Sequence, residues 1–141
     1  MAGVGAPAAV LSVGEMLNGN REQWEKFLND NREYINNVKD QQGRPLLISA
    51  ICRLYYKFFL MTDNSEFEIF CRQEIEVIEF FSEHCDLSVK SVEGYCPAEF
   101  ITHSNPFGKL KDNPTFMKLL LKLLTPQLIN DFPNRLFSQL G

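Results

Sequence analysis

The amino-acid sequence predicts an all-α protein, built as a short solenoid of antiparallel helix pairs that are joined by β-turn-like loops. One passage occurs twice, 51 positions apart, as NVKDQQGRP at residues 37–45 and as SVKSVEGYCP at residues 88–97. Each copy holds a glycine that suits a tight turn with positive φ, followed by a proline that can begin a helix. An amphipathic segment precedes each copy and an apolar segment follows it. The order helix, turn, helix is therefore used at least twice, which is typical of repeat arrays that present binding surfaces.

The composition fits one small domain. The 141 residues are 45% hydrophobic and include twelve phenylalanines, which is enough for a single core. No apolar run approaches the roughly 18 residues of a membrane span. Residues 1–11, interpreted as a flexible N-terminal lead-in, lack the basic residues of a secretory signal. Four cysteines without zinc-ligand spacing indicate reduced structural thiols, no metal or other cofactor, and a cytoplasmic protein.

Charge is distributed unevenly along the chain. The formal net charge of −4 argues against a nucleic-acid partner. Residues 63–86 carry eight acidic side chains against Arg72 alone, a net charge of −7, whereas residues 107–141 carry a net charge of +3. We therefore expect one acidic and one basic region of the surface, most simply as solvated outer faces of helices.

The first half of the chain predicts three helices. Ser12 and Glu15 have capping-box spacing and predict a short helix that ends near residues 18–20. A second helix is predicted with one buried face, formed by Trp24, Phe27 and Leu28, and it ends in the polar stretch 29–37. A third follows Pro45. One face of this helix is apolar and consists of Leu47, Ala50, Ile51, Leu54 and Phe58. A second, mixed stripe could contact a partner and consists of Ser49, Arg53, Tyr56 and Lys57.

The second half begins with an irregular region, which predicts an insertion near residues 54–73. An outer helix follows, with Ile75, Val77, Ile78 and Phe81 inside and Glu76, Glu79 and Glu83 outside. A shorter inner helix at 98–101 is predicted to stop at Asn105-Pro106, before a loop that runs from 104 to 113. The stripe of the last clear helix, which ends at Pro126, consists of Phe116, Leu119, Leu120, Leu123 and Leu124. Residues 128–137 predict a turn that enters one more helix.

This order of parts resembles the ankyrin repeat, a unit of about 33 residues with a β-turn and two antiparallel helices. GYCPAEFI at residues 94–101 is similar to the family pattern G-x-T-P-L-x-x-A, and CDLSVKS at 85–91 is similar to A-D-V-N-A-K-D. GRPLLISA at 43–50 keeps Gly43 and Ala50 but has its proline one place early, so the TPLH tetrad is intact in neither copy. The resemblance implies about three degenerate repeats over residues 12–141, with the insertion in the middle repeat.

The resemblance also implies a non-catalytic module that binds a partner protein through a concave face formed by inner helices and turn tips. The expected contact residues are the turn tips Gln41, Gln42, Arg44, Glu93 and Tyr95 and the mixed stripe Ser49, Arg53, Tyr56 and Lys57. The arginines would supply charge-assisted hydrogen bonds and the tyrosines amphipathic contact area. Such a module can serve as a regulator, an adaptor or an effector delivered into a host cell.

Two other functions stay open at this point. The chain can be a structural or capping module of a larger protein, with no ligand of its own. It can also be a small helical enzyme, which would need a pocket that joins His84 or His103 to a cysteine or carboxylate. No GxSxG, GxGxxG or GxxxxGK[ST] motif is present, so no catalytic residue is predicted.

Two apolar segments also leave alternatives. Six aromatic side chains surround the insertion, and either it folds back over them or some form an exposed contact patch: Tyr55, Tyr56, Phe58, Phe59, Phe67 and Phe70. The run from Leu119 to Leu124 has too few lysines for a membrane-surface helix and fits a terminal repeat. If its apolar face were uncovered, self-association through this C-terminal helix would follow.

Overall fold

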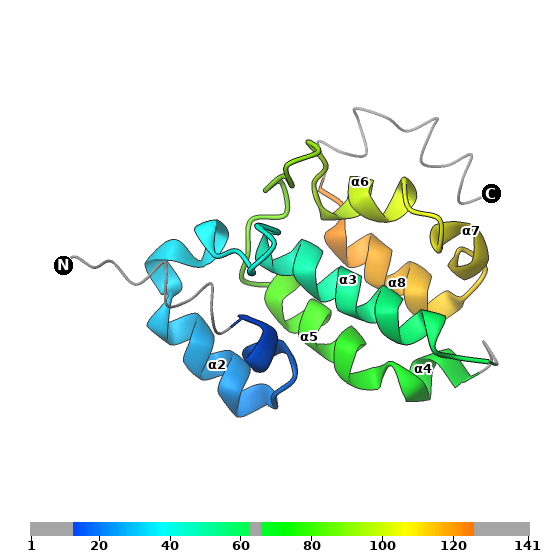
Figure 1. Ribbon diagram of the computed structural model, residues 1–141, viewed down its shortest axis with the longest axis horizontal. Helices are drawn as coiled ribbons and strands as arrows, with labels where there is room; N and C mark the ends of the chain where they lie inside the picture. Colours follow the sequence, from blue (N-terminus) through cyan, green and yellow to red (C-terminus); the bar gives the residue numbers. More distant parts are fainter. Residues whose placement is uncertain (1–12, 63–65, 126–141) are drawn as a thin grey trace.

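The computed structural model describes residues 13–62 and 66–125 (Figure 1). Within these ranges the chain is mostly helical and forms no β-strand, which confirms the all-α prediction. After a helical segment at residues 13–17, the elements are α2 (Arg21–Asp30), the 3-10 helix η1 (Arg32–Asn37), α3 (Leu46–Phe59), α4 (Phe67–Phe70), α5 (Arg72–Ser82), α6 (Pro97–Thr102), α7 (Phe107–Leu110) and α8 (Pro114–Leu123). No helix in the described ranges is both long and apolar enough to cross a membrane.

Helix α2 begins where a capping box satisfies its first backbone groups. The Asn20 side chain accepts a hydrogen bond from the Gln23 backbone at 3.0 Å, and the Gln23 side chain accepts one from the Asn20 backbone at 2.8 Å. The predicted face of Trp24, Phe27 and Leu28 is buried. Helix α2 ends at Asp30, within the predicted polar stretch 29–37, and the rest of that stretch contains η1, which buries Ile35.

The two glycine turns have the same backbone geometry. Gly43 and Gly94 have φ values of 80° and 90°, as the sequence predicts. The helices that follow begin at corresponding positions, since Leu46 and Pro97 are 51 residues apart. Pro97 is the first residue of α6, but Pro45 precedes α3 in an extended conformation, with ψ at 158°. The expectation that both prolines occupy the first helical position is therefore wrong for Pro45.

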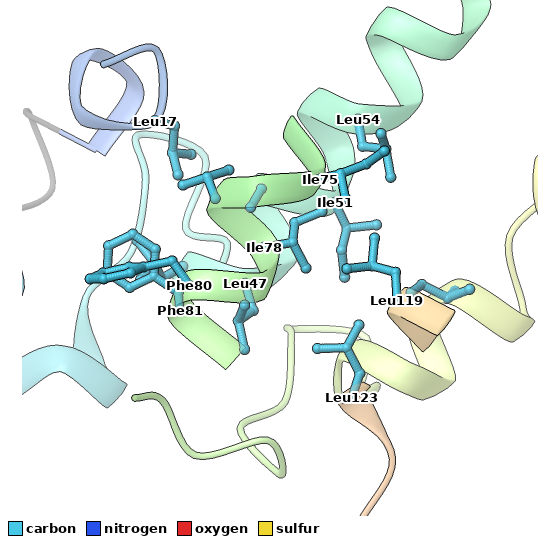
Figure 2. Packing of buried hydrophobic residues seen from close by; sticks show 14 of the residues in the cluster. Leu17, Leu47, Ile51, Leu54, Ile75, Ile78, Phe80, Phe81, Leu119 and Leu123 are labelled. Carbon is cyan, nitrogen blue, oxygen red and sulfur yellow. The ribbon is translucent and has the colours of Figure 1, made fainter. Parts of the chain in front are cut away.

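The helices pack as two stacked pairs. Helix α3 packs against α5 and α6, and α8 packs against α5 and α6. Figure 1 shows α3 and α6 running in one direction, with α5 and α8 running back beside them. Figure 2 shows side chains of α3, α5 and α8 pointing toward one another, among them Ile51, Ile78 and Leu119. Burial of these apolar side chains is the main stabilising contribution to such a core.

The stretch near residues 54–73, which the sequence predicts to be an insertion, is mostly helical in its described part. Residues 54–59 continue α3, because their apolar stripe still faces α5, and α5 already begins at Arg72. Between them Phe67 is completely buried, with its ring 6.2 Å from the rings of Phe58 and Phe116. The aromatic cluster is consequently divided. Buried members are Tyr55, Phe58 and Phe67, and exposed members are Tyr56, Phe59 and Phe70.

The loop predicted at 104–113 contains an element that the sequence did not indicate. Helix α7 buries Phe107 and Leu110, which are only one helical turn apart and so produce no recognisable stripe. Helix α8 follows, capped by the Asn113 side chain, which accepts from the Phe116 backbone at 3.1 Å. Its predicted stripe is buried, apart from the half-buried Leu124.

Several predictions fall outside the described residues: the lead-in at 1–11, the Ser12 cap, Pro126 and the segment 128–137. The described residues lie inside the predicted domain of residues 12–141, so the bounds of that domain stay predictions.

Candidate functional site

Five of the nine predicted contact residues line a single hollow, of about 380 Å³. It lies between the first helical segment, the Gly43 turn and the first turns of α3. We call it the turn-tip hollow, and its lining residues are Gly14, Glu15, Asn18, Asp40, Gln41, Gln42, Arg44, Ser49 and Arg53. Three segments that are separate in the sequence therefore supply one polar surface.

The Asp40 carboxylate organises the turn at the base of the hollow. Its Oδ1 accepts hydrogen bonds from the backbone N–H groups of Gln42 and Arg44, both at 2.9 Å. Its Oδ2 accepts from Nε of Arg44 at 2.7 Å and from the Ser49 hydroxyl at 2.8 Å. Asp40 is buried, so these four donors replace the water that the carboxylate has lost.

The charge of Asp40 is held by these same contacts. Burial by itself raises the pKa of Asp40. Hydrogen bonds from the Arg44 backbone, the Ser49 hydroxyl and the Arg44 side chain, together with the positive charge of Arg44, outweigh burial and lower the pKa below its ordinary value of 3.8. At neutral pH the turn therefore contains an ionised, internally neutralised pair.

Ser49 has a different role from the one that the sequence predicts. It belongs to the mixed stripe expected to face a partner, but only 3% of it is exposed. The reason is its place in the first turn of α3, where the hydroxyl donates to Asp40. Ser49 therefore stabilises the Gly43 turn through Asp40, and the prediction that it is an exposed contact residue is wrong.

Three predicted residues form the rim of the hollow, namely Gln41, Gln42 and Arg53. Gln41 and Gln42 are exposed at the turn tip, where the Gln42 side-chain carbonyl accepts from Arg44 at 2.8 Å. Arg53 is half-buried and donates to the side chain of Asn18, a contact that joins α3 to the first helical segment. The rim thus offers amide and guanidinium donors beside the exposed carboxylate of Glu15.

The other four predicted residues do not line this hollow. Tyr56 is exposed further along α3, and Lys57 faces Glu74 of α5 at 3.4 Å. Glu93 is exposed at the second turn tip. Tyr95 stacks on His103, with ring centroids 4.6 Å apart and ring planes inclined by 16°. The second turn tip is therefore a separate surface, and its tyrosine is already engaged.

Sequence reasoning missed four residues of the hollow, namely Gly14, Glu15, Asn18 and Asp40. Asp40 could have been found, because an aspartate three residues before a turn glycine commonly accepts from the backbone two residues on. Glu15 and Asn18 could not, since only tertiary packing brings the first helical segment beside the turn.

The cysteines and histidines do not form a reactive constellation in the described part of the chain. All four cysteines are free, and burial raises the pKa of Cys71 and of Cys96 to about 11 and that of Cys85 to about 12. These thiols are protonated at neutral pH and so are poor nucleophiles. Neither His84 nor His103 lines the hollow. Among the described residues, no three of histidine, cysteine, aspartate and glutamate are grouped to hold a metal ion.

No family model, curated protein or solved structure matches the chain.

Proposed function

We propose that the chain is a short array of degenerate ankyrin-type repeats that binds a partner protein through the turn-tip hollow. The helix pairs support this architecture. In the ankyrin pattern each repeat supplies one inner and one outer helix, and like helices stack on one another. Here α3 packs on α6 and α5 packs on α8, with a glycine turn before each of α3 and α6. The helical segment 13–17 and α2 are the natural candidates for the preceding pair.

One observation supports the binding role most strongly. The hollow is lined by polar groups from three segments, and the Asp40 carboxylate at its base already has its hydrogen-bond donors within the turn and α3. Because Asp40 is neutralised by Arg44, the groups left for a partner are the side chains of Gln41, Gln42, Arg53 and Glu15. They combine donors and acceptors and carry almost no net charge. Such a surface suits backbone amides and polar side chains of another protein, and does not suit a phosphate chain.

A binding role fits the chemistry of the rest of the chain better than catalysis does. The buried thiols are protonated at neutral pH, and the His103 ring is stacked on Tyr95. No cofactor is needed for this function. Four free cysteines are suited to a reducing compartment, so we place the protein in the cytoplasm, of its own cell or of a host. There it would act as a regulator, an adaptor or a host-directed effector.

The experiment is an affinity measurement with a matched control. A partner is first captured from cytosolic lysate, purified, and titrated against the wild-type chain and two triple variants. The test variant combines Gln41→Ala, Gln42→Ala and Arg53→Ala. The control combines Lys90→Ala, Lys109→Ala and Lys118→Ala, which are exposed and lie outside the hollow.

We expect the test variant to lose at least about tenfold in affinity, since truncating the few residues that dominate an interface costs about 2 kcal/mol or more. The control variant should bind like the wild type. Circular dichroism must first establish that all three chains are equally helical. Equal affinity of the test variant and the wild type would refute binding through the hollow.

A structural or capping role is the second candidate, and one observation favours it. Leu121 of α8, the last described helix, is 57% exposed although the other leucines on that helix are buried. A neighbouring domain or a second copy could cover this side chain. The same capture experiment separates the two functions, because a capping module retains no partner with either variant.

A further inference from the structure

A second concave region separates α2 from α5. In Figure 1 the end of α3 and α4 extend well beyond α2. A groove of about 960 Å³ lies between α2 and α5, with Trp24, Lys57, Ile69, Phe70 and Glu76 among its lining residues. We call it the α2–α5 groove.

An exposed apolar patch adjoins this groove. Its members are 41–72% exposed and comprise Tyr56, Phe59, Leu60, Ile69 and Phe70. Tyr56, Phe59 and Leu60 lie three and four positions apart and so share one face of α3. Phe70 connects the patch to the groove, because it lines both the groove and a smaller hollow beside Leu60. Five large apolar side chains exposed together are unusual on a monomer and mark a contact surface.

The charge around the patch and groove is acidic after internal pairs are removed. Lys57 is paired with Glu74 at 3.4 Å, and Lys122 with Glu79 at 3.0 Å, so these two lysines contribute no free charge. The exposed carboxylates of Glu66, Glu76 and Glu83 have no basic partner among the described residues. Arg21 also lines the groove and is paired with Glu25 at 3.4 Å, which leaves Arg72 as the basic lining residue without an ion pair among the described residues. An occupant that complements this surface must be apolar on one face and basic on its flanks.

Trp24 contributes a buried polar group to the wall of the groove. Its side chain lines the groove, yet it is only 4% exposed, and its indole N–H has no hydrogen-bond acceptor in the described part of the chain. A buried donor without an acceptor is costly.

We propose that the α2–α5 groove and the adjoining patch bind a basic amphipathic helix of a partner protein. In this recognition mode the apolar face of a helix lies in a groove, and its flanking charges set the orientation. Apart from Asn18, the groove shares no lining residue with the turn-tip hollow, so it is a second binding surface that does not depend on the first.

The chain carries its own probe for this experiment, because Trp24 is the single tryptophan and lines the groove. Two synthetic peptides of about 18 residues, long enough for five helical turns, are titrated while Trp24 emission is recorded. Both contain leucine at helical spacing and no tryptophan. One carries lysine and the other glutamate on the polar face. The variants are Ile69→Ser with Phe70→Ser, and Glu66→Lys with Glu76→Lys. The control is Val92→Ser, at a site that is 84% exposed and far along the chain from the groove.

We expect the lysine peptide to change the emission saturably and the glutamate peptide to leave it unchanged. Each double variant should weaken binding of the lysine peptide at least about tenfold, and Val92→Ser should not alter it. The charge variant changes no apolar side chain, so it tests the proposal even if the serine variant folds poorly.

Three results would overturn the proposal: no saturable change with the lysine peptide, equal binding of both peptides, or unchanged binding by both double variants. A fourth is wild-type self-association that the serine variant abolishes, measured by sedimentation, because the occupant would then be a second copy. None of these results bears on the turn-tip hollow, whose test uses different residues.

Discussion

The Gly43 turn and the Gly94 turn share one backbone and differ in what stabilises it. In the first, the Asp40 N–H donates to the Arg44 carbonyl at 3.0 Å and the Gly43 N–H to the Asp40 carbonyl at 2.9 Å. In the second, the Ser91 N–H donates to the Tyr95 carbonyl at 2.8 Å and the Gly94 N–H to the Ser91 carbonyl at 2.9 Å. The glycines and the register of the chain thus suffice for the turn geometry, with different side chains around them.

Side chains stabilise the two turns in different ways: the Gly43 turn through hydrogen bonds to a carboxylate, and the Gly94 turn through ring stacking and a helix cap. Asp40 collects four hydrogen bonds, whereas the Ser91 hydroxyl accepts only from the Tyr95 backbone, at 3.4 Å. The second turn instead has Tyr95 stacked on His103, and the Glu99 carboxylate accepts from the Cys96 N–H at 3.1 Å. Among the described residues, the first turn has exposed polar tips, Gln41 and Gln42, that line a hollow, which is why the binding role is assigned to it.

The largest expected difference between the turns is in the loss of unfolding free energy when Asp40 or Ser91, the residues at corresponding positions, is replaced by alanine. Asp40→Ala leaves the guanidinium of Arg44, the Ser49 hydroxyl and two backbone donors without their acceptor. We expect the free energy of unfolding to fall by about 2–4 kcal/mol. Ser91→Ala removes one long hydrogen bond and should cost about 0.5–1 kcal/mol. Urea unfolding followed by circular dichroism measures both, and equal losses would contradict the distinction.

The pH dependence of stability sharpens the same distinction. Because the folded-state pKa of Asp40 is lowered, its charge stabilises the fold above the ordinary value of 3.8, and this contribution is lost as the pH falls below it. The difference in unfolding free energy between the wild type and Asp40→Asn should be about 1–3 kcal/mol at neutral pH. It should shrink steadily between about pH 4 and pH 2. A difference that is independent of pH would show that the ionised form of Asp40 is not what stabilises the turn.

The smallest expected difference between the turns is in the cost of replacing their glycines. Gly43→Ala and Gly94→Ala each force a side chain into positive φ, at 80° and 90°, and should each destabilise by about 1–2 kcal/mol. Gly14→Ala is the matched control, because Gly14 is helical and an added methyl group would meet nothing within 4 Å. It should be neutral or slightly stabilising. A large difference between the two turn glycines, measured by thermal unfolding, would contradict a shared backbone requirement.

Much of the fold could be predicted because its signals are local. The stripe of Leu47, Ile51 and Leu54 identifies α3, and the stripe of Phe116, Leu119 and Leu123 identifies α8. Helix α7 could not be found in this way, since four residues are too few to establish a period. The end of α3 was misjudged because its last residues are aromatic and half of them are exposed, which weakens the contrast between its faces.

The candidate site was predicted in part. The turn tips Gln41 and Gln42 and the α3 residue Arg53 do line one hollow. Ser49 belongs to the same stripe as Arg53 but is buried, because Asp40 lies directly above the first turn of α3. Helical periodicity assigns residues to a face, and it does not report which part of that face a distant segment covers.

The sequence by itself therefore determines the class of fold, the helices with strong apolar stripes, and the two turns that require glycine. These properties depend on residues within about one or two helical turns of each other. Only the tertiary structure decides which polar residues meet. The turn-tip hollow lies where Arg53 of α3 contacts Asn18 beside the Gly43 turn, and the α2–α5 groove lies between two helices that are far apart in the sequence. Both are produced by packing between distant segments, which a local sequence pattern does not report.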